Sequence, residues 1–216
     1  YNWGEYISDG SDDSYDTNAE FEKYCREELG MNVKVNYITF SSNEDLYAKL
    51  SSNAVSYDVI IPSDYMIARL IKEDMLDPID FSKLSNYGNI DDSFKNPDYD
   101  PENKYSVPYT WGTVGIIYNP EAVSEEDVRS WSILWNSDYK NRITIKDSVR
   151  DAYIPAVVSV YSDEIASWNQ RLEAGEVSVE QYRAALDEIM NRTDDATIQA
   201  AGVALKEMKS NIYGLE

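Results

Sequence analysis

Strand-type apolar runs alternate with amphipathic helical patterns in the first part of the chain, and this alternation restricts its fold more than any other feature. Residues 33–37 alternate as a strand does, and residues 57–61 form an apolar run that Pro62 ends. Helical patterns cover residues 17–29, residues 42–50 and the stretch after Pro62. Repeated strand–helix units of this length predict an α/β fold with parallel strands.

The middle of the chain predicts a boundary between two lobes. Residues 77–105 are rich in Asp, Asn, Pro and Lys, which is typical of surface loops with short helical turns. Two extended segments follow and join at Gly112. We therefore expect an N-terminal α/β lobe over residues 1–112 and a second lobe over residues 113–216, mostly helical after residue 151.

The second lobe is expected to contain one short strand and several helices. Residues 143–145 form the strand pattern, and an apolar helical pattern runs from Asp151 to Tyr161. Two further helices are predicted, one capped by Ser178 and the other by Asp194 or Asp195, which are suitable N-cap residues.

The charge balance bears on the class of ligand. The sequence contains 40 acidic and 19 basic residues, which gives a formal net charge of −21. Such a field repels nucleic acid and anionic membrane surfaces, and it attracts an organic cation or a metal ion. An acidic composition also serves solubility alone.

Histidine is absent, which excludes several kinds of site. A Ser-His-Asp triad, a Cys-His pair and an imidazole-bound zinc are all impossible. The single cysteine, Cys25, falls on the apolar face of a predicted helix and is expected to be buried rather than nucleophilic. The sequence also contains no run of about 18 apolar residues that predicts a membrane span.

Three segments that follow predicted strands combine a carboxylate with an aromatic or hydroxyl side chain: residues 3–6, 62–65 and 147–151. Ligands of open parallel sheets bind beyond the carboxyl ends of the strands. Aromatic faces attract ammonium groups and cover methylene chains, and carboxylates pair with the charged amines. Together the segments predict a site for a linear alkyl polyamine.

Other interpretations of these residues remain open. A site for another small cation or for a sugar uses the same residue types. A glycoside hydrolase uses a pair of carboxylates, although no distinctive pair stands out in this sequence. Each segment also has a structural explanation, because tryptophans pack in cores and aspartates cap helices. Residues 8–16 do not have the ligand spacing of a calcium loop, so we predict neither a metal nor a cofactor.

Several blocks of sequence resemble a known family, in that family's order. They are YNWGEY at residues 1–6, SNE and YAKL within residues 42–50, YDVIIPS at residues 57–63 and YSVPYTWG at residues 105–112, followed by Trp131 and Trp135. These blocks resemble the spermidine/putrescine-binding proteins of bacterial ABC importers up to about residue 151. After Tyr161 only the helical pattern agrees.

The resemblance implies a two-lobed, type II periplasmic-binding-protein fold whose second lobe is incomplete in this chain. It implies an extracytoplasmic protein, periplasmic or at the cell surface, that closes over a polyamine without a chemical step and passes it to an ABC permease. A lipid anchor on a preceding segment is compatible with this location.

The resemblance also implies roles for individual residues. Trp3 and Tyr6 lie along the polyamine chain with Glu5 as a polar partner. Tyr65 forms another aromatic wall beside Ser63, and Asp151 pairs with an amine. The implied ligand-binding residues are therefore Trp3, Glu5, Tyr6, Ser63, Tyr65, Ser148 and Asp151.

Two departures from the family pattern affect these expectations. Ser148 stands at a position that is often acidic in spermidine binders, so the resemblance does not fix the preferred polyamine length. Members of the family also continue well beyond the length of this chain and add further site residues. We therefore expect the 216 residues alone to bind polyamine weakly or not at all.

Overall fold

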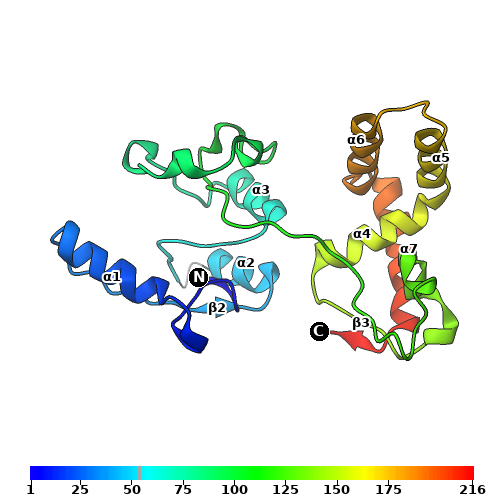
Figure 1. The fold of residues 1–216 in the computed structure, drawn as a ribbon, viewed down its shortest axis with the longest axis horizontal. Helices are drawn as coiled ribbons and strands as arrows, with labels where there is room; N and C mark the ends of the chain where they lie inside the picture. Colours follow the sequence, from blue (N-terminus) through cyan, green and yellow to red (C-terminus); the bar gives the residue numbers. More distant parts are fainter. Residues whose placement is uncertain (53–54) are drawn as a thin grey trace. The chain divides into compact units, whose positions relative to one another are not determined.

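The structure, a computed structural model, describes residues 1–52 and 55–216 (Figure 1). The chain forms two compact units, Tyr1–Gly112 and Thr113–Glu216. Each unit combines short parallel strand pairs with helices, in agreement with the predicted α/β class.

The first unit is organised around strand β1 (Asn2–Trp3), which pairs in parallel with β2 (Thr39–Phe40). On its other side, the amino group of Tyr1 donates to the carbonyl oxygen of Val59 over 2.8 Å. The amide of Ile61 then donates to the carbonyl oxygen of Tyr1 over 3.0 Å. The run at residues 57–61 therefore lies alongside β1, but the regular strand predicted there does not form.

The predicted strand at residues 33–37 is wrong in position. Regular pairing with β1 begins only at Thr39. The amide of Val35 donates instead to the carboxylate of Glu22 over 2.8 Å, so a side chain takes the donor that a strand ladder needs. The two extended segments expected over residues 106–119 also contain no regular strand.

The described part of the first unit contains the helices α1 (Thr17–Glu28), α2 (Asn43–Ser51) and α3 (Asp64–Lys72). Helices α2 and α3 pack together over a core formed by Tyr1, Phe40, Leu46, Met66 and Leu70. Five short 3-10 turns occupy the loops, at Ser11–Asp13, Phe81–Lys83, Tyr87–Asn89, Asp92–Phe94 and Pro101–Asn103.

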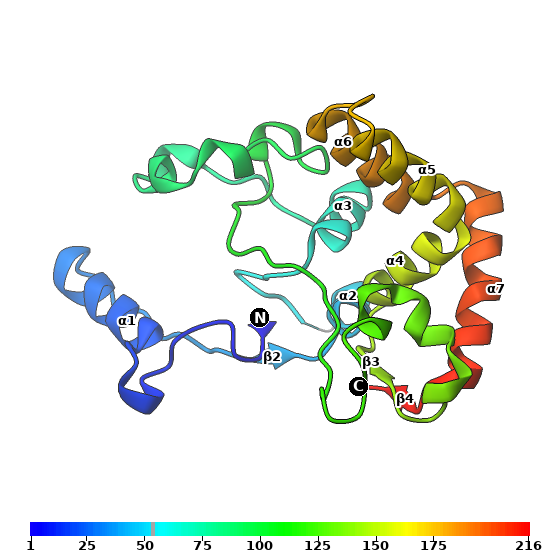
Figure 2. The ribbon, with the colours of Figure 1, turned by 45° about the vertical axis from the view of Figure 1, so that its right-hand side comes forward.

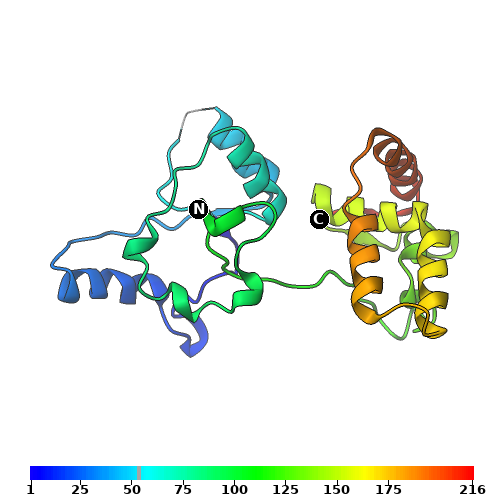
Figure 3. The same ribbon diagram turned by 90° about the horizontal axis from the view of Figure 1, so that it is seen from above.

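Helix α1 lies apart from α2 and α3 in all three views (Figures 1, 2 and 3). Its predicted apolar face is buried mainly at Cys25, which is 2% exposed, whereas Phe21 is half exposed. The prediction that Cys25 is a buried residue is therefore confirmed.

In the second unit, strand β3 (Thr144–Ile145) pairs in parallel with β4 (Gly214–Leu215). Helix α4 (Val149–Val160) packs against α7 (Asp195–Asn211). Helices α5 (Ser162–Glu173) and α6 (Val179–Met190) lie side by side, as Figures 1 and 3 show. Short 3-10 segments precede β3, at Asp127–Arg129, Trp131–Trp135 and Ser137–Tyr139.

Two apolar clusters stabilise this unit. One joins α4, α6 and α7 through Ala156, Val157, Ile189, Ala201 and Ala204. The other joins the Trp131–Trp135 segment to the end of α7 through Ile133, Leu134, Met208 and Ile212. The Trp131–Trp135 segment is thus part of the core of this unit.

Helix starts agree with the capping signals of the sequence. Ser178 and Gln181 form a complete capping box at α6, and Asp194 caps α7 by accepting from the amide of Thr197. Helix α5, in contrast, is absent from our sequence-based prediction. Within residues 1–52 and 55–216, no helix is both long enough and apolar enough to cross a membrane.

Candidate functional site

The first group of predicted site residues follows β1. The indole of Trp3 packs against the ring of Phe40, with ring centroids 4.5 Å apart. The ring centroid of Tyr6 lies 6.3 Å from that of Trp3. Glu5 is exposed and has a φ of 59°, a left-handed conformation that is uncommon for a residue with a side chain. The turn thus places two aromatic rings and a carboxylate within four residues.

Two tyrosine hydroxyls hold the backbone of this turn. Tyr37 donates to the carbonyl oxygen of Trp3 over 3.3 Å, and Tyr109 donates to the carbonyl oxygen of Tyr6. Burial raises the pKa of the Tyr37 phenol above its ordinary value. Backbone groups from opposite ends of the turn are therefore fixed by residues far away in the sequence.

The second group is organised by Asn43, whose side chain is buried at the start of α2. Its amide nitrogen donates to the hydroxyl oxygens of Ser63, over 3.1 Å, and Tyr65, over 3.0 Å. Its amide oxygen accepts from the backbone N–H of Ser63 over 3.1 Å. One buried amide therefore fixes the positions of two predicted site residues.

The hydroxyl of Tyr65 in turn donates to the carboxylate of Glu44 over 2.9 Å. The sequence analysis places residues 42–44 at the start of a helical pattern and among the family-like blocks, and it omits Asn43 and Glu44 from the site. Their position directly after β2 is the signal that could have found them, because that is where ligand-binding residues of parallel sheets lie.

Trp3 and Tyr65 pack against the same apolar core, which contains Phe40, Leu46 and Met66. The predicted aromatic residues of the first and second groups are therefore brought together on one unit. Trp3 and Tyr65 are both partly buried, so packing holds each ring in place.

The third group, Ser148 and Asp151, lies in the second unit, where β3 leads into α4. The hydroxyl of Ser148 caps α4 by accepting from the amide of Asp151 over 3.4 Å. The carboxylate of Asp151 lies in the first turn of α4, where the helix dipole favours negative charge. A carboxylate oxygen of Asp151 also lies 3.2 Å from the ammonium of Lys146.

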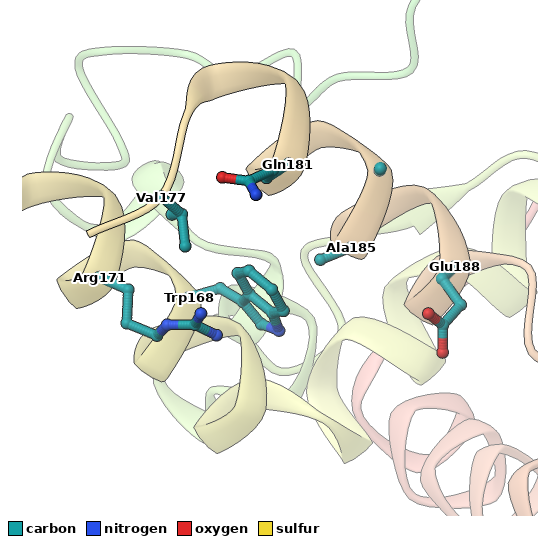
Figure 4. Close-up of a pocket in the computed structure, with 7 residues that line it drawn as sticks. Trp168, Arg171, Val177, Gln181, Ala185 and Glu188 are labelled. Atoms are coloured by element: carbon teal, nitrogen blue, oxygen red, sulfur yellow. The ribbon is translucent and has the colours of Figure 1, made fainter. Parts of the chain in front are cut away.

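A hollow of about 330 Å³ lies between α5 and α6, lined by Trp168 and Val177 among others (Figure 4). None of its lining residues is a predicted site residue. Its polar groups are already engaged: Arg171 stacks on Trp168, Gln181 completes the capping box of α6, and Glu188 pairs with Arg192. Each of these three side chains thus already has a neighbour within the unit.

The described residues include no cluster of three or more Asp, Glu or Cys side chains that could hold a metal ion. The acidic segment at residues 8–16 is occupied by internal contacts. Asp9 accepts from the amide of Ser11, and Asp16 accepts from the amide of Ala19 to cap α1.

Comparison with curated proteins confirms the resemblance. The chain is 38% identical over 154 residues to the spermidine/putrescine-binding periplasmic protein of Salmonella typhimurium. The match covers 71% of this chain and 41% of that protein. The chain thus spans less than half the length of this curated relative.

Solved structures agree in fold. A Listeria monocytogenes structure provisionally assigned to a spermidine/putrescine ABC transporter matches with a TM-score of 0.72 and 31% identity. The lipoprotein Tp0655 (TpPotD) of Treponema pallidum matches with a TM-score of 0.69 and 27% identity. Both matches cover all of this chain, and they cover 55% and 56% of the two solved chains.

The model of one protein family matches residues 19–215, which is most of the chain. That span includes most of α1, all of α2 to α7 and both of the later predicted site segments. The chain therefore belongs to the bacterial extracellular solute-binding proteins.

Proposed function

We propose that this chain is part of an extracytoplasmic polyamine-binding protein that supplies spermidine or putrescine to an ABC importer. The observation that carries the proposal is the packing of Trp3 and Tyr65 on one core, with the carboxylate of Glu44 accepting a hydrogen bond from the Tyr65 hydroxyl. This arrangement occurs in a chain whose curated relatives are named for spermidine and putrescine.

The chemistry of the proposed site suits a flexible polycation. Aromatic faces attract ammonium groups and cover the methylene chain between them. In the first unit, Glu5 and Glu44 supply negative charge for the amines, with Trp3, Tyr6 and Tyr65 as ring surfaces. In the second unit, Asp151 supplies a carboxylate for an amine. Ser63 and Ser148 are proposed as neutral polar neighbours. The net charge of −21 adds a field that raises the local concentration of cations.

The proposed role is binding without a chemical step, since the family is one of solute-binding proteins. The proposed partner is the permease of an ABC importer, and the proposed location is periplasmic or at the cell surface. A lipid anchor on an adjoining segment would hold the protein at the cell surface. Peptide mapping of the protein purified from its native membrane tests for such an anchor.

A thermal-shift panel tests the proposal on the whole protein, meaning this chain with any sequence that adjoins it. Putrescine and spermidine are expected to raise the midpoint, because a ligand at 100 times its Kd stabilises the folded state by about 2.7 kcal/mol. Stabilisation by sugars or calcium alone would contradict the polyamine assignment. Recovery of chemically altered polyamine after incubation would contradict the proposed absence of catalysis.

A further inference from the structure

Lys146 stands directly after β3, five residues before Asp151, and its surroundings are fixed by backbone contacts. The amide of Glu216 donates to the carbonyl oxygen of Ile145 over 3.0 Å, and the amide of Asp147 donates to a backbone oxygen of Glu216 over 2.6 Å. Ser148 then caps α4. The segment that carries Lys146 and Asp151 is thus held at both ends.

The Lys146 ammonium pairs with the Asp151 carboxylate over 3.2 Å. The two side chains differ in exposure: that of Lys146 is 57% exposed and that of Asp151 only 19%. The carboxylate is therefore the sheltered member of the pair, and the more exposed ammonium of Lys146 lies next to its negative charge. The neighbouring cation Arg150 donates to the side-chain oxygen of Asn191 over 3.1 Å.

We propose that Lys146 is an internal competitor for Asp151 and lowers the affinity of the site for every amine. This inference rests on the proposed function, in which Asp151 pairs with a ligand amine. A lysine side chain ends in a primary ammonium, the same group that ends a polyamine. An incoming amine must share the carboxylate with Lys146 or replace it, and sharing places two positive charges side by side.

Competition for one carboxylate and a long-range effect of the Lys146 charge predict different changes in the affinities for putrescine and spermidine. Each ligand presents a single ammonium to Asp151, so removal of Lys146 improves binding of putrescine and spermidine by the same factor. A long-range field acts on the total charge of the ligand and favours spermidine, which carries one more amine. The ratio of the two gains therefore distinguishes the two mechanisms.

The test is calorimetric titration of the whole protein with putrescine and with spermidine at one ionic strength. Lys146→Met is compared with Lys209→Met, which removes the same charge from an exposed position on α7. Relative to Lys209→Met, we expect Lys146→Met to bind both ligands about two- to fivefold tighter, the range of an exposed ion pair. Lys146→Arg should bind as the unsubstituted protein does.

A double-mutant cycle completes the test. In an Asp151→Asn background, Lys146→Met should give no further gain, because the carboxylate that the two cations share is gone. Equal affinities of Lys146→Met and Lys209→Met, or a gain that persists in the Asp151→Asn background, would overturn the inference. Absence of binding by every variant, the unsubstituted protein included, would instead overturn the proposed function and this inference with it.

Discussion

The hydroxyl of Tyr65 lies 2.9 Å from a carboxylate oxygen of Glu44 and also accepts a hydrogen bond from the buried amide of Asn43. An aromatic wall and a negative charge are thus joined across helices α2 and α3. Because Asn43 also binds Ser63, the start of each helix is fixed relative to the other.

Tyr65→Phe tests whether this hydroxyl orders the site. The change keeps the ring and removes one donor and one acceptor, so we expect a loss of stability of about 0.5–1.5 kcal/mol and weaker polyamine binding. Urea unfolding and calorimetry measure the two effects. Tyr15→Phe, at an exposed position of the same unit, is the control and should change neither.

Asn43→Ala is expected to be more damaging. It removes all three hydrogen bonds of the amide and leaves the backbone N–H of Ser63 without this partner, at a cost of about 1–3 kcal/mol in the free energy of unfolding. Urea unfolding measures the cost. A change below about 0.5 kcal/mol would show that Asn43 does not organise the two helix starts.

Asp151→Asn should weaken polyamine binding by about 1–3 kcal/mol, the range for a hydrogen bond to a charged group. Asp163→Asn is the matched control, because Asp163 is an exposed aspartate in the first turn of α5. Both variants lose similar helix-dipole stabilisation, so only a contact with the ligand separates them in calorimetry. Equal affinities would remove Asp151 from the site.

The pairing of Arg192 with Glu164 predicts a pH dependence of stability. The two hydrogen bonds from Arg192 lower the pKa of Glu164 below its ordinary value of 4.5, and the same bonds raise the pKa of Arg192. A lowered folded-state pKa contributes stability above the unfolded pKa, and the contribution is lost as the pH falls through the folded pKa. The loss therefore begins below about pH 4.5.

Glu164→Gln checks this dependence by urea unfolding at pH 7 and at pH 3.5. The variant should be less stable at pH 7 by up to about 1 kcal/mol, and the difference should shrink at the lower pH. Glu173→Gln changes an exposed residue on the same helix and is the control. A deficit that is as large at pH 3.5 as at pH 7 would argue against the ion pair.

The sequence predicts those elements whose signals are local. The caps at Ser42, Ser178 and Asp194 are hydrogen bonds within three residues, so their chemistry can be read from neighbouring positions. Helix α5 escaped prediction because it follows α4 at Tyr161 without a glycine or proline between them. Strand β2 was misplaced because Glu22, 13 residues away, takes the amide of Val35.

The residues of the candidate site also fall into those that the sequence predicts and those that it does not. Trp3 and Tyr65 can be proposed from strand ends and from the family resemblance, since both are adjacent to recognisable patterns. The roles of Asn43, Glu44 and Lys146 depend on contacts between side chains. Asn43 reaches Ser63 across 20 residues, and no periodicity or cap signal encodes that distance. Contacts of this kind become visible only when the chain is folded.

The measurement that tests the central claim most directly is calorimetric titration of the whole protein with spermidine, repeated for Trp3→Leu and Trp3→Phe. The account predicts saturable binding of one spermidine per chain, a loss of about 1–2 kcal/mol with leucine, and retention of most affinity with phenylalanine, which keeps an aromatic face. Binding that is indifferent to the loss of the ring, or no binding of spermidine at all, would contradict it.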